Sequence, residues 1–345
     1  MGGDVRYARW DGVGRPFQLV TDPDSAHGEL GDGAVLVAVE LATVCGSDLH
    51  TVAGHRPAPT PTILGHEQVG RVVATGAGTS VRPGDRVVWS VTVSCGQCAR
   101  CTRGLEQKCL RLRKFGHEPI TAAWTLSGGF ATHAVLPPGT TIVPVPDDLP
   151  DAVAAPASCA TATVAAVLDA VPPVAGRRVL ITGAGLLGVT AAAFAASAGA
   201  EVTVCDPDPA RRLLAGRFGA AHTVTPDALP TGVDVAFELS GSAAAVAGCL
   251  AALDVGGHAV LAGSVSPGPS VPLDPERLVR HLLTVTGVHN YRPHHLTRAV
   301  EFLAGHHHRF PFADLVGDQH ALADIEQAFK AAHAPVLRQA LNPQH

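Results

Sequence analysis

A strand, a glycine-rich turn and a helix follow one another at residues 178–198, and this run restricts the fold more than any other feature. The apolar stretch Arg178–Thr182 leads directly into a G-x-G-x-x-G motif and then into an Ala-rich segment. The three glycines permit, in order, a tight turn, the close approach of a pyrophosphate, and close packing of helix on strand. The helix N-terminus also favours phosphate. The run therefore predicts a dinucleotide site in a parallel sheet, with these residues binding the cofactor: Gly183, Gly185, Leu187 and Gly188.

The next apolar stretch, Glu201–Cys205, ends in Asp206. An acidic side chain at this place can bind both hydroxyls of the adenosine ribose and repels a 2′-phosphate, so it favours NAD over NADP. Asp206 is also explained as a turn residue before Pro207, and Arg211 or Arg212 could reach the ribose or a phosphate. We therefore predict NAD, bound in part by Asp206 and Arg211, with NADP as the alternative.

The pattern of apolar residues changes near residue 150. Val-rich stretches between 34 and 93 are separated by Gly and Pro, which is typical of β-strands. The segment 136–150 holds five prolines and closes this part. After a helical segment at 152–170, short apolar strands alternate with helices, which predicts βαβ units in a doubly wound parallel sheet, an α/β fold. These strands are expected at 178–182, 201–205, 233–238, 258–262 and 283–288, and later helices at 296–305 and 322–333.

Charge and hydropathy exclude several classes of protein. The 345 residues carry 25 Lys and Arg against 30 Asp and Glu, a formal charge of −5, whereas nucleic-acid binders and polybasic membrane anchors carry a basic surplus. No apolar run approaches the roughly 18 residues of a spanning helix, and the N-terminal stretch lacks the apolar core of a secretory signal. We expect a cytoplasmic globular protein whose partners are neither nucleic acids nor membranes.

Four of the eight cysteines form a C-x2-C-x2-C-x7-C pattern: Cys95, Cys98, Cys101 and Cys109. Four thiolates so close in sequence can enclose Zn²⁺ tetrahedrally and leave no position for a substrate, which predicts a structural zinc lobe at 95–109. A ferredoxin-type iron–sulfur cluster is less compatible, because that motif places its fourth cysteine sooner and follows it with proline. A redox dithiol needs only two cysteines, and a zinc knuckle on nucleic acid needs a more basic loop.

Two further cysteines and one histidine stand in polar surroundings. Cys45 begins a C-G-S-D-L-H segment, His66 lies in G-H-E, and Cys159 follows far downstream. Two thiolates and one imidazole are the ligand set of an open catalytic zinc. No local spacing joins the three, however, and a lone Cys or His is more often a core or capping residue. The residues by themselves leave both interpretations open, whereas Cys205 and Cys249 are predicted to be small buried side chains.

Taken together, these motifs resemble the zinc-dependent medium-chain dehydrogenase/reductase superfamily of the alcohol dehydrogenase type. The likeness spans essentially the whole chain and rests on motifs in the right order: C-G-S-D-x-H at 45–50, G-H-E at 65–67 with Gly70, the four-cysteine lobe, Cys159 with Thr163, and G-x-G-x-x-G at 183–188. The resemblance implies a GroES-like β-rich catalytic domain at 1–150 and 291–345, and a Rossmann domain at 151–290.

The resemblance also implies a catalytic zinc centre. Cys45, His66 and Cys159 would be its ligands, and Glu67 would be a nearby carboxylate that can approach the metal. Asp48 would accept a hydrogen bond from His66 and so orient its ring. With the four-cysteine lobe, the resemblance implies two zinc ions per subunit.

A proton relay and an activity follow from the same resemblance. Ser47 would contact the substrate hydroxyl, His50 would pass its proton outward, and Thr163 would lie against the nicotinamide. The implied reaction is hydride transfer between NAD(H) and a small alcohol or aldehyde. The alternative is a catalytically silent NAD(H)-binding zinc scaffold or sensor, which needs no relay. Relatives form homodimers and homotetramers, which implies association through the strand expected at 283–288.

A narrower likeness links the chain to alcohol dehydrogenases associated with phosphonate metabolism. It rests on the stretches 60–67, 89–90, 114–118, 126–130 and 151–156. It implies a phosphonate alcohol or a phosphonoacetaldehyde-like aldehyde as substrate. A phosphonate dianion needs cationic donors, and we expect Arg56, Lys114 and His117 to supply them. The alternative is that these are solvated loop charges, or charges that offset the zinc-lobe thiolates.

Overall fold

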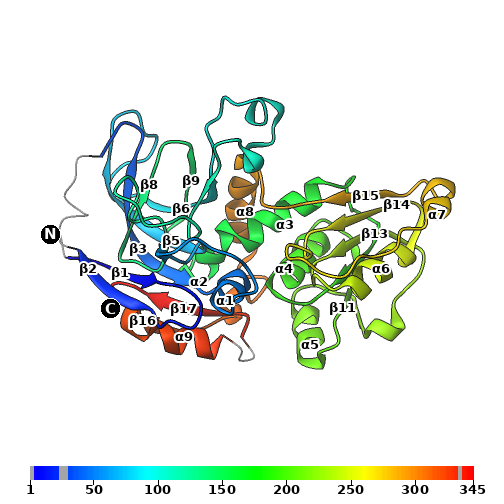
Figure 1. The fold of residues 1–345 in the computed structure, drawn as a ribbon. Coiled ribbons are helices and arrows are strands. Elements are labelled where there is room, and N and C mark those ends of the chain that lie inside the picture. The colour runs from blue at the N-terminus through cyan, green and yellow to red at the C-terminus, as the bar shows by residue number, and fades with distance from the viewer. Residues whose placement is uncertain (1–3, 23–29, 333–335) are drawn as a thin grey trace. The chain divides into compact units, whose positions relative to one another are not determined.

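The computed structural model describes residues 4–22, 30–332 and 336–345, and the chain forms two compact units (Figure 1). Unit 1 comprises Met1–Cys159, Arg292–His307 and Phe312–His345, and unit 2 comprises Ala160–Tyr291 and His308–Pro311. The first division therefore follows Cys159 and not the Pro-rich segment that ends at residue 150. The reason is that 151–158 fold as α2 (Asp151–Ala154) and the 3₁₀ helix η3 (Ala155–Ser158), and both pack on strands of unit 1.

The helix expected over 152–170 is interrupted. It forms α2, η3 and then α3 (Ala160–Asp169), with Cys159 in a non-helical conformation between η3 and α3. Pro156 lacks the N–H that a continuous helix would use at this point, which favours the break. The prediction of one helix was wrong here, and the interruption falls at one of the expected metal ligands.

The described residues of unit 1 form two sheets. One has the order β2-β1-β4, and the other has the path β16-β17-β3-β5-β6-β7, with β8 paired to β3 and β9 paired to β6. The strands are β1 (Val5–Trp10), β2 (Gln18–Asp22), β3 (Val35–Thr43), β4 (Thr62–Ile63), β5 (Gln68–Thr75), β6 (Arg86–Val93), β7 (Arg113–Lys114), β8 (His133–Leu136), β9 (Thr140–Pro144), β16 (Val316–Ala321) and β17 (Arg338–Asn342). The strands expected between 34 and 93 are thus present as β3, β5 and β6.

Besides α2 and η3, the described residues of unit 1 form helices of 3 to 14 residues. They are α1 (Gly46–Val52), η1 (Cys101–Arg103), η2 (Glu106–Lys108), α8 (Pro293–His306), η5 (Phe312–Leu315), η6 (Leu322–Asp324) and α9 (Ile325–Ala331). The helix expected at 322–333 is therefore η6 followed by α9, and residue 333 lies outside the described residues. The core of this unit is built from valines of β3 and β6 with a few large rings, chiefly Trp10, Trp89, Phe115 and Phe130.

The last strand of the chain, β17, lies inside the larger sheet of unit 1, between β16 and β3. β17 pairs antiparallel with β3, with Ala340 opposite Thr43 and Leu341 opposite Ala42. Ala340 and Leu341 are both fully buried. Because Thr43 lies only two positions before Cys45, this pairing places the start of β17 next to the expected metal ligands.

Unit 2 is a six-stranded parallel sheet with the order β12-β11-β10-β13-β14-β15 (Figure 1). Its strands are β10 (Arg178–Thr182), β11 (Glu201–Cys205), β12 (His222–Val224), β13 (Val233–Glu238), β14 (Leu253–Leu261) and β15 (Thr284–Gly287). Its remaining helices are α4 (Leu186–Ser197), α5 (Pro209–Arg217), η4 (Pro226–Ala228), α6 (Ala243–Ala252) and α7 (Pro275–Arg280). The doubly wound α/β sheet predicted from the sequence is confirmed, and the order of strands reverses between β10 and β13.

Among the described residues, no single helix is both long and apolar enough to cross a membrane. One bent pair, Asp151–Ser158 with Ala160–Asp169, meets that criterion by length and composition only.

Candidate active site

Cys45, His66 and Cys159 come together in unit 1 from three separate parts of the chain. Each offers one ligand atom, and these atoms lie within 4.8 Å of one another. Cys45 immediately precedes α1, His66 lies just before β5, and Cys159 follows η3. The three residues whose spacing gave no local signal are therefore placed as one group.

The loop that carries His66 is shaped by a glycine and by a serine hydroxyl. Gly65 has a φ of +92°, and a Cβ there would stand 2.7 Å from the ring of Phe130, so only glycine fits. The Ser158 hydroxyl, which is fully buried, donates a hydrogen bond to the His66 carbonyl at 3.0 Å. This bond ties η3, and with it Cys159, to the backbone of the second ligand.

Side chains of α1 surround the imidazole of His66. Asp48 Oδ2 accepts a hydrogen bond from the Cys45 N–H at 2.9 Å, and its Oδ1 lies 3.4 Å from His66 Nδ1. Ser47 Oγ lies 3.1 Å from His66 Nε2. Burial favours neutral His66, but Asp48 outweighs it and raises the pKa of His66 well above its ordinary value. His50, one helical turn after Ser47, is exposed to solvent.

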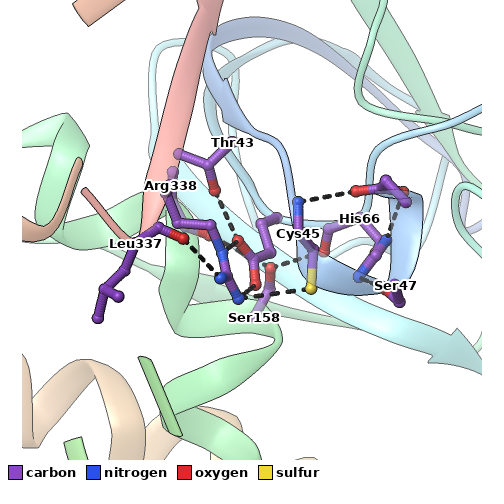
Figure 2. Close-up of polar contacts among 10 residues, drawn as sticks. Thr43, Cys45, Ser47, His66, Ser158, Leu337 and Arg338 are labelled. Atoms are coloured by element: carbon purple, nitrogen blue, oxygen red, sulfur yellow. Dashed lines mark hydrogen bonds and ion pairs between the residues drawn. The ribbon is translucent and has the colours of Figure 1, made fainter. Parts of the chain in front are cut away.

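A buried ion pair that the sequence analysis missed adjoins this group. Arg338, at the start of β17, contacts both carboxylate oxygens of Glu67 at 2.6 and 2.9 Å, and Thr43 donates to Glu67 at 2.7 Å. Arg338 Nη2 also lies 3.4 Å from Cys45 Sγ, and Figure 2 shows the guanidinium linked both to this sulfur and to the Leu337 carbonyl. Burial raises the pKa of Glu67, and the positive charge of Arg338 partly offsets this rise. The one signal in the sequence is a single charge in an apolar C-terminal stretch.

The donor set of the group fits zinc. Two thiols and one imidazole are borderline-soft ligands that suit Zn²⁺ and leave its fourth position open. The hydrogen bond from Cys159 and the charge of Arg338 lower the pKa of the Cys45 thiol well below its ordinary value. A thiolate is the form in which cysteine binds metal. Arg338 would balance part of the negative charge that two thiolates bring to a buried site.

Of the three residues expected at the substrate, His117 lies beside His66, and Arg56 and Lys114 lie near His117. The His117 ring centroid is 5.0 Å from that of His66. Burial lowers the pKa of His117 well below its ordinary value, and the charges of His66, Arg56 and Lys114 lower it further. Burial also lowers the pKa of Lys114, with Arg56 and Lys108 adding to the effect. Arg56 and Lys114 thus lie near a neutral His117, and we call these three residues the cationic cluster after the two charged members.

The four cysteines of the lobe also converge. Cys95, Cys98, Cys101 and Cys109 place their sulfur atoms within 4.8 Å of one another. All eight cysteines lie in the described residues, and none of them forms a disulfide. Main-chain N–H groups of Leu110 and Cys101 lower the pKa of Cys98 to about 5, whereas burial raises that of Cys101 to about 12. N–H donors aimed at sulfur are typical of a thiolate site built for a metal.

The glycine motif of unit 2 has the geometry that its sequence predicts. Gly183 follows β10 with a φ of +92°, and a Cβ there would stand 2.9 Å from the Ser240 side chain. A Cβ at Gly188 would collide with the Gly183 carbonyl. Helix α4 begins at Leu186 with Gly185 as its N-cap, and Leu187 is half-buried in the first turn. The turn therefore depends on glycine at 183 and 188, whereas a Cβ at Gly185 would meet only the Arg211 side chain, at 3.9 Å.

Asp206 lies against this turn. Its Oδ2 accepts a hydrogen bond from the Ala184 N–H at 2.7 Å, and its Oδ1 accepts one from the Asp208 N–H at 2.9 Å. Arg212 donates to the Asp206 carbonyl at 2.7 Å, and Arg211 Nη1 lies 3.9 Å from a Cβ built on Gly185. An acid and a cation therefore both border the site, which leaves NAD and NADP equally compatible. Thr163, the remaining predicted cofactor contact, is half-buried on α3.

Comparisons with known proteins match both parts of the chain. Residues 31–147 match the alcohol dehydrogenase GroES-like domain, and residues 187–305 match the zinc-binding dehydrogenase domain. A 5-exo-hydroxycamphor dehydrogenase of Pseudomonas putida is 32% identical over 330 residues, covering 88% of this chain and 90% of that protein. An L-threonine 3-dehydrogenase of Anaeromyxobacter dehalogenans is 34% identical over 281 residues, covering 76% of this chain and 77% of that protein.

Solved structures agree with these sequence matches. An alcohol dehydrogenase of Thermotoga maritima aligns with a TM-score of 0.91 at 28% identity, covering 99% of this chain and 100% of the other. A putative zinc-binding dehydrogenase of Sinorhizobium meliloti, bound to NADP, aligns with a TM-score of 0.87 at 26% identity, again covering 99% and 100%. Both alignments span the two units.

Proposed function

Because the chain belongs to the zinc-type alcohol dehydrogenase family of medium-chain dehydrogenases, we propose that Cys45, His66 and Cys159 hold its catalytic zinc. We propose equally that the four-cysteine group holds a second, structural zinc. The protein is a zinc-dependent oxidoreductase of the alcohol dehydrogenase type that uses NAD(P). The silent scaffold considered from the sequence is not favoured, because the relatives are named dehydrogenases.

The convergence of the three ligand atoms within 4.8 Å is the observation that carries the mechanism. When bound, zinc supplies a Lewis acid for the substrate oxygen, and the nicotinamide accepts the hydride. Ser47, at 3.1 Å from His66 Nε2, takes up the hydroxyl proton of the substrate. His50 lies one turn further along α1 and passes that proton to solvent. Asp48 fixes both Cys45 and His66 while this happens.

We further propose that the substrate is a small phosphonate alcohol or the matching aldehyde. The cationic cluster supports this, because the cations Arg56 and Lys114 lie near His117, whose ring is beside His66, and a phosphonate dianion is bound by such cations. The site would then hold the hydroxyl at the metal and the anion at the cluster. Positioning at two points fixes the carbon that gives up hydride.

A substrate panel with both cofactors tests this assignment. Turnover is followed at 340 nm with 2-hydroxyethylphosphonate and with neutral alcohols of similar size. Lys114→Gln should raise KM for the phosphonate about 10- to 100-fold, since one charge-assisted bond contributes roughly 1.5–3 kcal/mol, and should leave neutral alcohols unchanged. Lys330→Gln, on the exposed face of α9, is the matched control. Equal losses for both substrate classes, or inert phosphonates, would contradict the phosphonate assignment alone.

We also propose that the protein acts in the cytoplasm as a homodimer or homotetramer. Six of the cysteines are proposed zinc ligands and need reduced sulfur, which fits a reducing compartment. β15 is an edge strand of the sheet in unit 2. Val285 on β15 is 38% exposed and the neighbouring Leu282 is 72% exposed. An apolar sheet edge of this kind is suited to pairing with a second copy of the chain.

A further inference from the structure

Glu238, the last residue of β13, is a fully buried carboxylate. Its Oε1 accepts hydrogen bonds from the Ser240 N–H at 2.8 Å, the Ser240 hydroxyl at 2.7 Å and the Gly241 N–H at 2.7 Å. Its Oε2 accepts a longer one from the Ser264 hydroxyl at 3.4 Å. Two fixed main-chain donors on one oxygen suit an ionised carboxylate, which only accepts.

No Lys or Arg among the described residues pairs with Glu238. This sets it apart from the other buried acids, because Glu67 is paired with Arg338 and Asp48 faces His66. An unpaired charge in a protein interior is unfavourable for stability, and a neutral side chain could accept the same N–H groups. A buried carboxylate without a cationic partner is therefore expected where a function uses its charge.

The turn that Glu238 holds lies against the dinucleotide motif. Gly183 packs on Ser240, and Gly241 packs on the carbonyl of Gly263 in the loop after β14, where a Cβ would stand 2.8 Å away. The loops after β10, β13 and β14 thus meet with no room for side chains. Glu238 is the carboxylate beneath this junction.

The strand order tells which half of a dinucleotide lies over the junction. The order reverses between β10 and β13, and dinucleotides bind across such a reversal. Asp206 follows β11, on the adenosine side of β10. The nicotinamide half therefore falls on the other side, over the ends of β13 and β14. The oxidised nicotinamide ring carries a positive charge, and the reduced ring is neutral.

We propose that Glu238 places a buried negative charge under the nicotinamide half, and that this charge strengthens binding of the oxidised cofactor relative to the reduced one. Stronger binding of the oxidised form shifts the equilibrium on the enzyme toward the alcohol and oxidised cofactor. The inference rests on NAD(P) use by the family and is independent of the phosphonate assignment. It holds for whichever alcohol is the substrate.

The test compares dissociation constants of the zinc-loaded protein for the two forms of its preferred cofactor. The reduced form is titrated by its fluorescence, and the oxidised form is measured by displacement. Glu238→Gln keeps the size of the side chain and removes its charge. We expect it to raise Kd for the oxidised form on the order of tenfold, as for loss of one unit charge in a protein interior, and to change Kd for the reduced form less than twofold.

Glu201→Gln is the matched control, because it removes an exposed carboxylate from β11 of the same sheet. We expect it to leave both constants unchanged. If Glu238→Gln changes the two constants equally, or changes neither, the proposal is overturned. If that variant does not fold, Glu238→Asp keeps the charge and should retain the wild-type ratio of the two constants. A ratio shifted by the aspartate variant would also overturn the proposal.

Discussion

At the scale of single residues, the environment of the proposed catalytic metal depends on charges that compensate one another. Glu67 is fully buried and forms an ion pair with Arg338, whose guanidinium also contacts Cys45. Neither partner tolerates burial without the other. The C-terminal strand is therefore part of the site, although its sequence carries no motif.

Replacing the cation of this pair should be strongly destabilising. Arg338→Met leaves the Glu67 carboxylate buried beside two cysteines, and loss of one partner of a buried pair costs about 3–5 kcal/mol. Urea unfolding of the zinc-loaded protein measures this change. Arg71→Met removes the cation of the exposed Arg71–Glu40 pair, at 3.0 Å, and should cost about 0–1 kcal/mol. If the free energy of unfolding falls by similar amounts in the two variants, the buried Glu67–Arg338 pair stabilises the protein no more than an exposed pair does.

Each cysteine of the lobe should be required for the second zinc. Cys98→Ser removes a thiol whose pKa is lowered to about 5 by main-chain N–H groups. We expect zinc content to fall by one ion per subunit and Tm to fall, because a structural zinc contributes folding free energy. Elemental analysis and thermal unfolding report both. Cys249→Ala, at a buried cysteine outside both groups, should retain two ions, and a folded Cys98→Ser protein with two ions would exclude the lobe as a metal site.

At the scale of elements, local patterns predicted local structure well. The stretches 178–182, 201–205 and 233–238 are strands with the predicted ends, because apolar runs between turns carry their own signal. The interruption at Cys159 was missed, because the Ala-rich pattern of 152–170 predicts a helix more strongly than the single Pro156 predicts a break. The contacts of Ser158 and Arg338 were missed because they join segments far apart in sequence. The proposed catalytic ligands Cys45, His66 and Cys159 were suggested by family resemblance, because no local spacing groups them, whereas spacing alone predicted the four-cysteine lobe.

The bond between η3 and the His66 loop should control how firmly zinc is held. Ser158→Ala removes the hydroxyl that fixes two predicted ligands relative to each other. We expect loss of one zinc to a chelator to become about tenfold faster, within the usual range for removing an outer contact of a ligand. Ser90→Ala removes another buried hydroxyl, which donates to the Thr92 carbonyl at 2.7 Å. If both variants release zinc at the same rate, Ser158 has no special role in the site.

At the scale of the whole molecule, the exposed edge of unit 2 should set the oligomeric state. Val285→Lys puts a charge on β15, where it would be buried in any pairing of two edges. We expect the mass in solution, measured by light scattering, to fall by half. Val13→Lys changes an apolar residue of unit 1 that is 61% exposed and should leave the mass unchanged. An unaltered mass for Val285→Lys would place the subunit interface elsewhere.

Both units contribute to one chemistry, since unit 1 carries the proposed metal ligands and unit 2 carries the cofactor motif. The most direct test is the zinc content and cofactor binding of the His66→Ala variant. We predict two zinc ions per subunit in the wild type and one in the variant, which should bind reduced cofactor normally but show no turnover. Retention of two ions with turnover in His66→Ala, or zinc-free wild-type protein that is folded and active, would contradict the account.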